Sequence, residues 1–136
     1  MALNTRFATG IHALVLLATE PDKLHTSADV ARRLNTNSVV VRRIFSQLRK
    51  ADLILIHKGP SGGSKLARSA KEITLRDIHR AVHPHGLLHA PSLPAMPGLH
   101  SVLKGSFSDA SRAFEKELDQ TTLSQLVKKA QKKAKS

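Results

Sequence analysis

The stretch SVVVRRIFSQLRKADLILIHKGPSGGSKL (residues 38–66) decides the fold of this chain. Four apolar residues in its first half recur at i, i+3, i+4 and i+7, the spacing of one face of a helix: Val41, Ile44, Phe45 and Leu48. The segment LILIHK (53–58) is apolar and β-branched and predicts a strand, GPSGG predicts a turn, and SKLAR (64–68) can return as a second strand. We therefore expect a helix followed by a two-stranded hairpin.

The turn at residues 59–63 also matches G-x-S-x-G, the nucleophile elbow of serine hydrolases, and Ser64-Lys65 is close to the end of a phosphate-binding loop. Both of those motifs need a helix to begin directly after them, and here a strand is expected instead. Glycines tolerate positive φ and Pro60 holds its neighbour extended, so a tight turn explains the composition better. Because Lys58 and Lys65 flank this turn, we interpret the hairpin as a DNA-binding wing and expect no enzymatic activity.

Two further helices are expected before the wing. HTSADVARRLN (25–35) contains Thr26-x-x-Asp29, a capping-box pattern, and only a short polar turn separates it from the helix that begins near Ser38. Two short amphipathic helices joined in this way are typical of a helix-turn-helix. Residues 5–19 predict the preceding helix, because four apolar residues recur at helical spacing: Phe7, Ile11, Leu14 and Ala18.

After the wing, the sequence predicts a short helix, a proline-rich loop and a long helix. Thr74-x-x-Asp77 predicts the start of a helix over 75–82, and residues 83–98 are rich in proline and predict a loop. The next residues keep a spacing of three to four, and we interpret them as a dimerisation surface: Leu99, Val102, Leu103, Phe107, Ala110, Phe114 and Leu118. A helix of that length carries more apolar surface than a small winged domain can cover, which favours a second subunit. A helix that folds back on its own domain is the alternative.

The expected fold is therefore mainly α with a small β-wing, in three parts. Residues 1–83 form a winged helix-turn-helix DNA-binding domain, residues 84–98 a proline-rich loop, and residues 99–136 a dimerisation helix with a basic C-terminal tail.

Composition indicates the class of partner. The chain has 22 Lys and Arg against 10 Asp and Glu, a net charge of +12, which favours a polyanion such as nucleic acid. The absence of cysteine excludes disulfides, thiolate nucleophiles and metal sites held by thiolates. No segment approaches the 18 or so apolar residues that span a bilayer, and no secretory signal is evident. We expect a cytoplasmic protein without a membrane partner.

The charge is concentrated on the elements that would face DNA. Residues 32–71 contain one acid, Asp52, and ten basic residues: Arg32, Arg33, Arg42, Arg43, Arg49, Lys50, Lys58, Lys65, Arg68 and Lys71. At the start of the second helix, Asn37 and Ser38 can hydrogen-bond to base edges, and Val39 and Val40 can meet thymine methyl groups. Ser38 can equally be a plain helix cap.

Arg42 and Arg43 come about one turn later in that helix. One of them can reach a guanine edge while the other holds a phosphate, and the spacing leaves open which does which.

The segments TRFATGIHALVLLA (5–18), VVVRRIFSQLRKADLI (39–54), KGPSGGSKLARSAKEITLRDIHRAV (58–82) and FEKELDQTTLSQLV (114–127) resemble the Rrf2 family of bacterial winged-helix transcriptional regulators. The resemblance implies a homodimer formed through the long C-terminal helix and bound to a palindromic operator in double-stranded DNA, usually as a repressor. By position, it places DNA contacts on Thr5, Arg6, Ser38, Val39, Val40, Arg42, Lys58, Gly59, Pro60, Ser61, Gly62, Gly63 and Ser64. Several members hold an iron–sulfur cluster on cysteines, which this chain lacks, so no cofactor is expected.

Two other functions stay open at this stage. Five histidines fall within residues 79–100, which allows a metal-responsive regulator: His79, His83, His85, His89 and His100. The high charge and the lysine-rich tail also fit a non-specific, architectural DNA-binding protein. The operator, the controlled genes and any small-molecule effector are outside what these patterns indicate.

Overall fold

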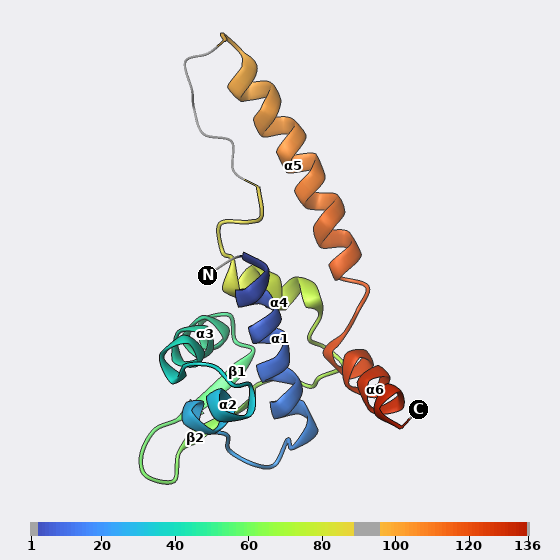
Figure 1. Ribbon diagram of the computed structural model, residues 1–136. Helices are drawn as coiled ribbons and strands as arrows, with labels where there is room; N and C mark the ends of the chain where they lie inside the picture. Colours follow the sequence, from blue (N-terminus) through green and yellow to red (C-terminus); the bar gives the residue numbers. More distant parts are fainter. Residues whose placement is uncertain (1–2, 89–95, 136) are drawn as a thin grey trace.

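The computed structural model describes residues 3–88 and 96–135. The elements run in the order α1 (Leu3–Thr19), α2 (Ser27–Arg33), α3 (Ser38–Lys50), β1 (Ile54–His57), β2 (Gly63–Leu66), α4 (Leu75–Val82), α5 (Leu99–Leu118) and α6 (Leu123–Ala134), as Figure 1 shows. The described chain is mainly helical and carries a two-stranded antiparallel wing, which confirms the expected fold class. Residues 89–95 of the proline-rich loop, including His89, lie outside the described residues.

Local side-chain caps explain where the helix-turn-helix begins and ends. The Thr26 hydroxyl accepts a hydrogen bond from the Asp29 amide at 3.0 Å, which starts α2 as predicted. In the turn that follows, Asn35 adopts the left-handed region with φ of 55°, a conformation that asparagine tolerates. Asn37, and not Ser38, caps α3, because its Oδ1 accepts a hydrogen bond from the Val39 amide at 2.7 Å.

The wing is held to the body of the domain through its second strand. β1 pairs with β2 from Ile54 opposite Leu66 to His57 opposite Gly63, so both strands are shorter than the sequence suggested. Beyond this pairing, the backbones of Ser64 and His25 exchange two hydrogen bonds of 2.8 and 2.9 Å. This bridge fixes the direction in which the turn at residues 58–62 projects from the domain.

The core lies where α1, α3, α4 and β1 meet. The four apolar residues predicted for α3 are all buried in it, which confirms that part of the pattern: Val41, Ile44, Phe45 and Leu48. In α1 the buried face is turned slightly from the expected one. Ala13, Leu14 and Leu17 are buried, whereas Ile11 is only partly buried.

The last helix returns to the winged domain. Leu123, at the start of α6, is fully buried, and its amide donates a 2.7 Å hydrogen bond to the Ile73 carbonyl. A capping box between Thr122 and Gln125 fixes this start, and α6 then packs along α1. Residues 123–134, grouped from the sequence with the dimerisation helix and tail, are thus packed against the N-terminal domain.

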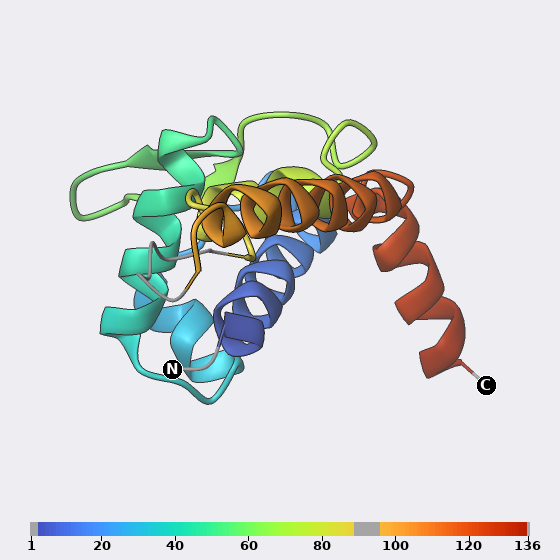
Figure 2. The ribbon, with the colours of Figure 1, turned by 90° about the horizontal axis from the view of Figure 1, so that it is seen from above.

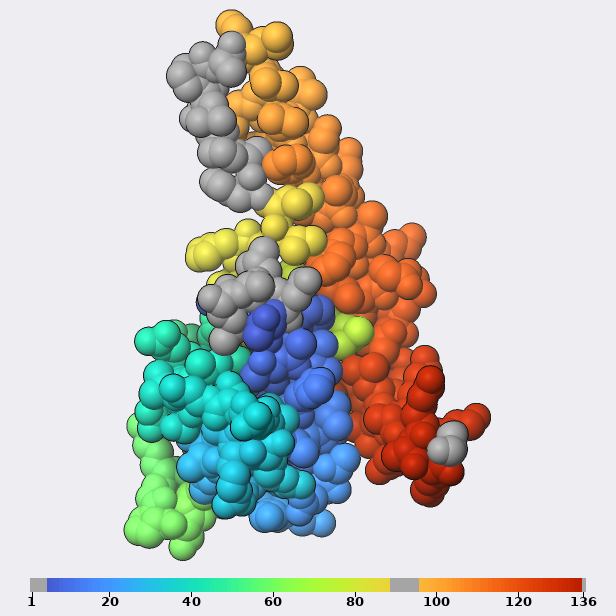
Figure 3. Space-filling view, viewed as in Figure 1, coloured from blue at the N-terminus to red at the C-terminus, as the bar shows by residue number. Residues whose placement is uncertain are grey.

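Helix α5 projects from the rest of the molecule, as Figures 1 and 3 show, and in the view from above it lies across α1 and α4 (Figure 2). None of its 20 residues is buried in the chain. Its C-terminal end packs on α4, where the Phe114 and His79 rings lie 5.0 Å apart and Arg80 donates two hydrogen bonds to Glu115 at 2.9 and 2.8 Å. Its N-terminal half carries exposed apolar side chains that nothing in the described chain covers.

Candidate nucleic-acid interface

The outer face of α3 is exposed and strongly basic. Because its apolar residues point into the core, the helix turns six exposed residues away from the domain: Val39, Arg42, Arg43, Ser46, Arg49 and Lys50. Four of these six side chains carry a positive charge. Among the described residues, no acidic side chain forms an ion pair with any of the four, so their charge is available to a ligand.

Three arginines away from this face are paired with acidic neighbours. Arg33 contacts Glu20 at 3.0 Å, and Arg32 forms a close ion pair with Asp29 on the same helix. Arg68, beyond the wing, lies 3.6 Å from Asp77. Of the ten basic residues that the sequence groups together, three are thus paired with acidic residues. The other seven form no ion pair within the described residues, and six of these seven lie on α3 and the wing.

A hollow of about 470 Å³ separates α3 from the wing. Arg42 and Arg49 line it from α3, and His57 and Lys58 line it from the wing. Ile56 contributes an exposed apolar side chain to the same hollow. Its position and positive charge suit a phosphate chain that runs between the helix and the wing.

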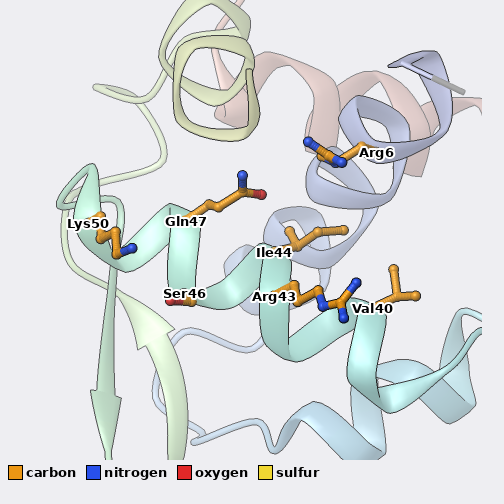
Figure 4. A pocket seen from close by; sticks show the side chains of 7 residues that line it. All are labelled: Arg6, Val40, Arg43, Ile44, Ser46, Gln47 and Lys50. Atoms are coloured by element: carbon orange, nitrogen blue, oxygen red, sulfur yellow. The ribbon is translucent and has the colours of Figure 1, made fainter. Parts of the chain in front are cut away.

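A second hollow of about 470 Å³ lies on the other side of α3, between that helix and the start of α1 (Figure 4). Arg6 lines it from α1, and Arg43, Gln47 and Lys50 line it from α3. Arg6 and Gln47 each donate a hydrogen bond to the Val82 carbonyl, at 3.4 and 3.5 Å. These bonds place a guanidinium group at the C-terminal end of α4, where the helix dipole favours a cation.

The two hollows separate the arginines that the sequence left undistinguished. Arg42 lies on the wing side of α3, and Arg43 lies on the side of Arg6. The major groove of B-DNA, about 12 Å wide, admits one helix between its two sugar–phosphate rims. A helix with a basic hollow on each flank matches that geometry, because each hollow can receive one rim.

The remaining predicted site residues divide by exposure. Thr5 and the wing residues Lys58 to Ser61 are exposed, and Ser38 is half-buried at the start of α3. Val40 is half-buried against the core and lines the hollow of Arg6. Ser64 is only 3% exposed at the base of the wing, so we do not retain it as a DNA contact.

Ser46 and Gln47 were not singled out from the sequence, although both line a hollow. Their positions in the sequence could have indicated them, because Ser46 follows Arg42 and Gln47 follows Arg43 by one helical turn, on the same side of α3. Sequence periodicity indicates that turn but not the hollow that it faces.

Gly62 is required by the shape of the wing turn. Its amide donates a hydrogen bond to the Gly59 carbonyl at 3.0 Å, and a Cβ atom at this position would lie 2.0 Å from the His57 carbonyl oxygen. We expect Gly62→Ala to displace the wing and to lower the affinity for DNA about tenfold, the equivalent of ~1.4 kcal/mol. Fluorescence anisotropy with labelled duplexes measures this loss. The control is Gly105→Ala, where nothing lies within 4 Å of the added carbon; an equal loss there contradicts the assignment to the wing.

With no cysteine in the chain, its residues do not fit a thiolate-held iron–sulfur cluster. Within residues 3–88 and 96–135, no three His, Asp or Glu side chains are grouped so that they could hold a metal ion. Over the same residues, no helix is both long and apolar enough to cross a membrane.

Comparisons with known proteins agree with this geometry. Residues 3–129 match the family model Rrf2, described as iron-dependent transcriptional regulator. The chain is 34% identical to YwnA of Bacillus subtilis (strain 168), named as a putative HTH-type transcriptional regulator, over 92% of this chain and 96% of YwnA. Among solved structures it resembles IscR of T. potens, with a TM-score of 0.68 and 25% identity over 93% of this chain and 85% of that one. It also resembles CymR of Staphylococcus aureus in its oxidized form, with a TM-score of 0.67 and 26% identity over 93% of this chain and 96% of that one.

Proposed function

Because the chain belongs to the Rrf2 family of transcriptional regulators, we propose that it binds a palindromic operator as a homodimer and represses the adjacent genes. DNA binding and transcriptional regulation follow from the family itself. The observation that carries the finer proposal is the outer face of α3, where four exposed basic side chains lie between two basic hollows. Helix α3 enters the major groove, and the wing approaches the neighbouring minor groove.

The proposed DNA contacts fall into two groups, those that read bases and those that hold phosphates. Val39, Arg42 and Ser46 are exposed on α3 and are placed to meet base edges. Arg6, Arg43 and Lys50 hold one rim of the groove, while Arg49 and Lys58 hold the other. Asn37 acts mainly as the cap that sets the direction of α3, since its side-chain oxygen is already bonded to the Val39 amide.

The homodimer forms through α5. Leu99, Val102 and Leu103 are 38%, 65% and 36% exposed, which is unusual for apolar residues that recur on one face of a helix. Phe114 and Glu115 fix the other end of α5 to α4, so this apolar surface is held out rigidly from the domain. Two copies that pair the same surface generate a two-fold axis.

The two-fold axis predicts the form of the operator. Two α3 helices related by that axis read inverted half-sites, with their centres about 34–36 Å apart or a multiple of this distance. A dimer seated in successive major grooves over a promoter excludes RNA polymerase, and repression is the direct consequence.

Selection from genomic DNA tests the proposal. Purified protein is incubated with sheared genomic DNA at ~150 mM salt, and the retained fragments are sequenced. We expect a few loci that share an inverted repeat and are bound roughly 10³-fold or more tighter than bulk DNA. Even coverage of the genome that disappears as the salt concentration rises supports the non-specific, architectural function instead.

A further inference from the structure

A histidine lies at the centre of the contact between α5 and the winged domain. His79, on α4, is 3% exposed and sits between the ring of Phe7, from α1, and the ring of Phe114, from α5. Both ring centroids lie 5.0 Å from that of His79, with interplanar angles of 84° and 76°. His83, 7% exposed, adds a fourth ring, also at 5.0 Å. We call these four rings the His79 joint.

The surroundings of the joint favour an uncharged imidazole. Burial lowers the pKa of His79, the neighbouring His83 lowers it further, and Glu115 opposes both effects. The carboxylate of Glu115, however, already accepts two hydrogen bonds from Arg80 and lies 3.7 Å from Arg76. A proton on His79 would lie close to His83, and the Glu115 carboxylate that could stabilise it is already paired with Arg80 and Arg76.

The charged groups around the joint come from each element packed against it. Helix α4 contributes Arg76, Arg80 and the following His83, and α5 contributes Glu115. Helix α1 contributes Arg6, next to Phe7, whose guanidinium group is bonded to the Val82 carbonyl. Of these groups, His83 lowers the pKa of His79 and Glu115 raises it, and burial of the ring is the largest cause that disfavours the protonated form.

The joint also sets the direction of α5. The edge-to-face contact of Phe114 with His79 and the ion pairs of Glu115 lie at the C-terminal end of that helix, whereas its exposed apolar half lies at the other end. A small change of angle at the joint is therefore enlarged along a helix about 30 Å long.

We propose that His79 is a proton sensor: its protonation in mildly acidic conditions loosens Phe114 from the joint, changes the direction of α5 relative to α3, and releases the operator. The movement of α5 is a property of the single chain. The release of DNA rests on the proposed homodimer, because it acts through the spacing of the two α3 helices.

The direction of the pH dependence follows from the depressed pKa of His79. An unfolded histidine has a pKa of about 6.5, above that of the buried one. Below that value the unfolded or opened form binds more protons than the closed form. The closed joint is therefore fully stable above about pH 6.5 and loses stability as the pH falls from there toward the pKa of the folded state.

Distance measurement between two spin labels tests the movement without DNA. The chain has no native cysteine, so two introduced cysteines are the only residues that take a label. We place them at exposed positions, Ala28→Cys in α2 and Ser108→Cys in α5. Labelled protein is diluted in unlabelled protein, so that distances within one chain are observed. We expect one narrow distance at about pH 7.5 and a broadened or shifted one at about pH 5.5.

Two substitutions in the labelled protein identify the group responsible. His79→Phe keeps a ring between Phe7 and Phe114 but cannot be protonated, and we expect its distance to stay narrow at both pH values. His85→Phe, at an exposed histidine close to the joint in sequence, must keep the response of the parent protein. If the distance between the labels in the His79→Phe protein broadens or shifts at acidic pH as much as in the parent protein, the proposal is overturned.

A nuclear magnetic resonance titration of the unsubstituted protein covers the case in which His79→Phe does not fold. We expect the His79 ring to titrate below about 6.5, together with shifts of the Phe7 and Phe114 ring resonances. Titration at or above that value without those shifts overturns the proposal.

A second experiment measures DNA affinity as a function of pH, with the genomic fragments that the protein selects at about pH 7.5. We expect their affinity for the parent protein to fall by up to about tenfold per subunit at about pH 5.5, since that pH lies about one unit below the ordinary pKa of histidine, and to fall less for His79→Phe. Equal losses for both proteins overturn the regulatory role. If the protein has no specific operator at all, genomic coverage is already even at about pH 7.5. That result tests the proposed function and is distinct from a failure of the pH response.

Discussion

Replacing both Val102 and Leu103 with glutamate is expected to convert the proposed homodimer into a monomer and to lower the affinity for the proposed operator at least about 100-fold. The two side chains are exposed in the single chain, so the substitutions remove no core contact within it. In the dimer they would bring four carboxylates into an apolar interface, where burying an unpaired charge is costly. A monomer then binds one half-site and loses the gain of about 10²–10⁴ that linked binding provides.

Light scattering measures the mass, and anisotropy with the selected fragments measures the affinity. Ser101→Glu with Ser108→Glu is the matched control, because it adds the same charge to exposed positions of α5 away from the apolar surface. That control must stay dimeric. A Val102→Glu, Leu103→Glu protein that keeps the mass of a dimer rules out α5 as the dimerisation helix.

Point substitutions are preferable here to removal of the whole C-terminal segment. Leu123 is fully buried against the winged domain, and the backbone of Thr74 pairs with that of Thr122. Truncation after Pro97 would therefore expose core surface as well as remove α5, and a loss of DNA binding could not be assigned to either cause.

Replacing Arg42 and Arg43 together with alanine is expected to weaken operator binding much more than binding to random DNA. Each arginine that reads a base contributes about 1–3 kcal/mol of discrimination, whereas one that holds a phosphate weakens binding to all sequences alike. Both side chains are exposed on α3 and project to opposite sides of it. The double substitution therefore removes contacts on both flanks of the helix.

The single substitutions separate the two roles. Arg43 shares its hollow with Arg6 and Lys50, and we expect Arg43→Ala to reduce the salt dependence of binding by about one unit on operator and random DNA alike. The excess loss on the operator then belongs to Arg42. The control is Arg32→Ala, at an exposed arginine already paired with Asp29, which should change neither affinity. Equal losses on operator and random DNA for the double variant contradict a role in base reading.

Short-range patterns predicted the elements of this fold well. The spacing of Val41, Ile44, Phe45 and Leu48 identified both α3 and its buried face, because a helix repeats every 3.6 residues whatever surrounds it. The capping box of Thr74 and Asp77 forms as predicted, since both of its hydrogen bonds join residues three apart. Even the wing was recognisable, because its glycines serve a turn that closes within a few residues.

Choices between neighbouring residues were harder to predict. Both Asn37 and Ser38 are good helix caps, and the backbone path out of the turn decided that Asn37 takes this role. Ser64 belongs to the wing in sequence, yet its pairing with the distant His25 buries it at the base of the hairpin.

By itself, then, the sequence determined a winged helix-turn-helix with a basic helix before the wing and a long helix with an apolar face after it, because periodicity, caps and charge are local properties. Only the tertiary structure decided that Arg42 and Arg43 face different hollows, that Leu123 completes the core, and that His79 is buried between two phenylalanine rings. Each of these depends on which distant segments meet. Such contacts form where packing of the whole chain is most favourable, and no local pattern records their partners.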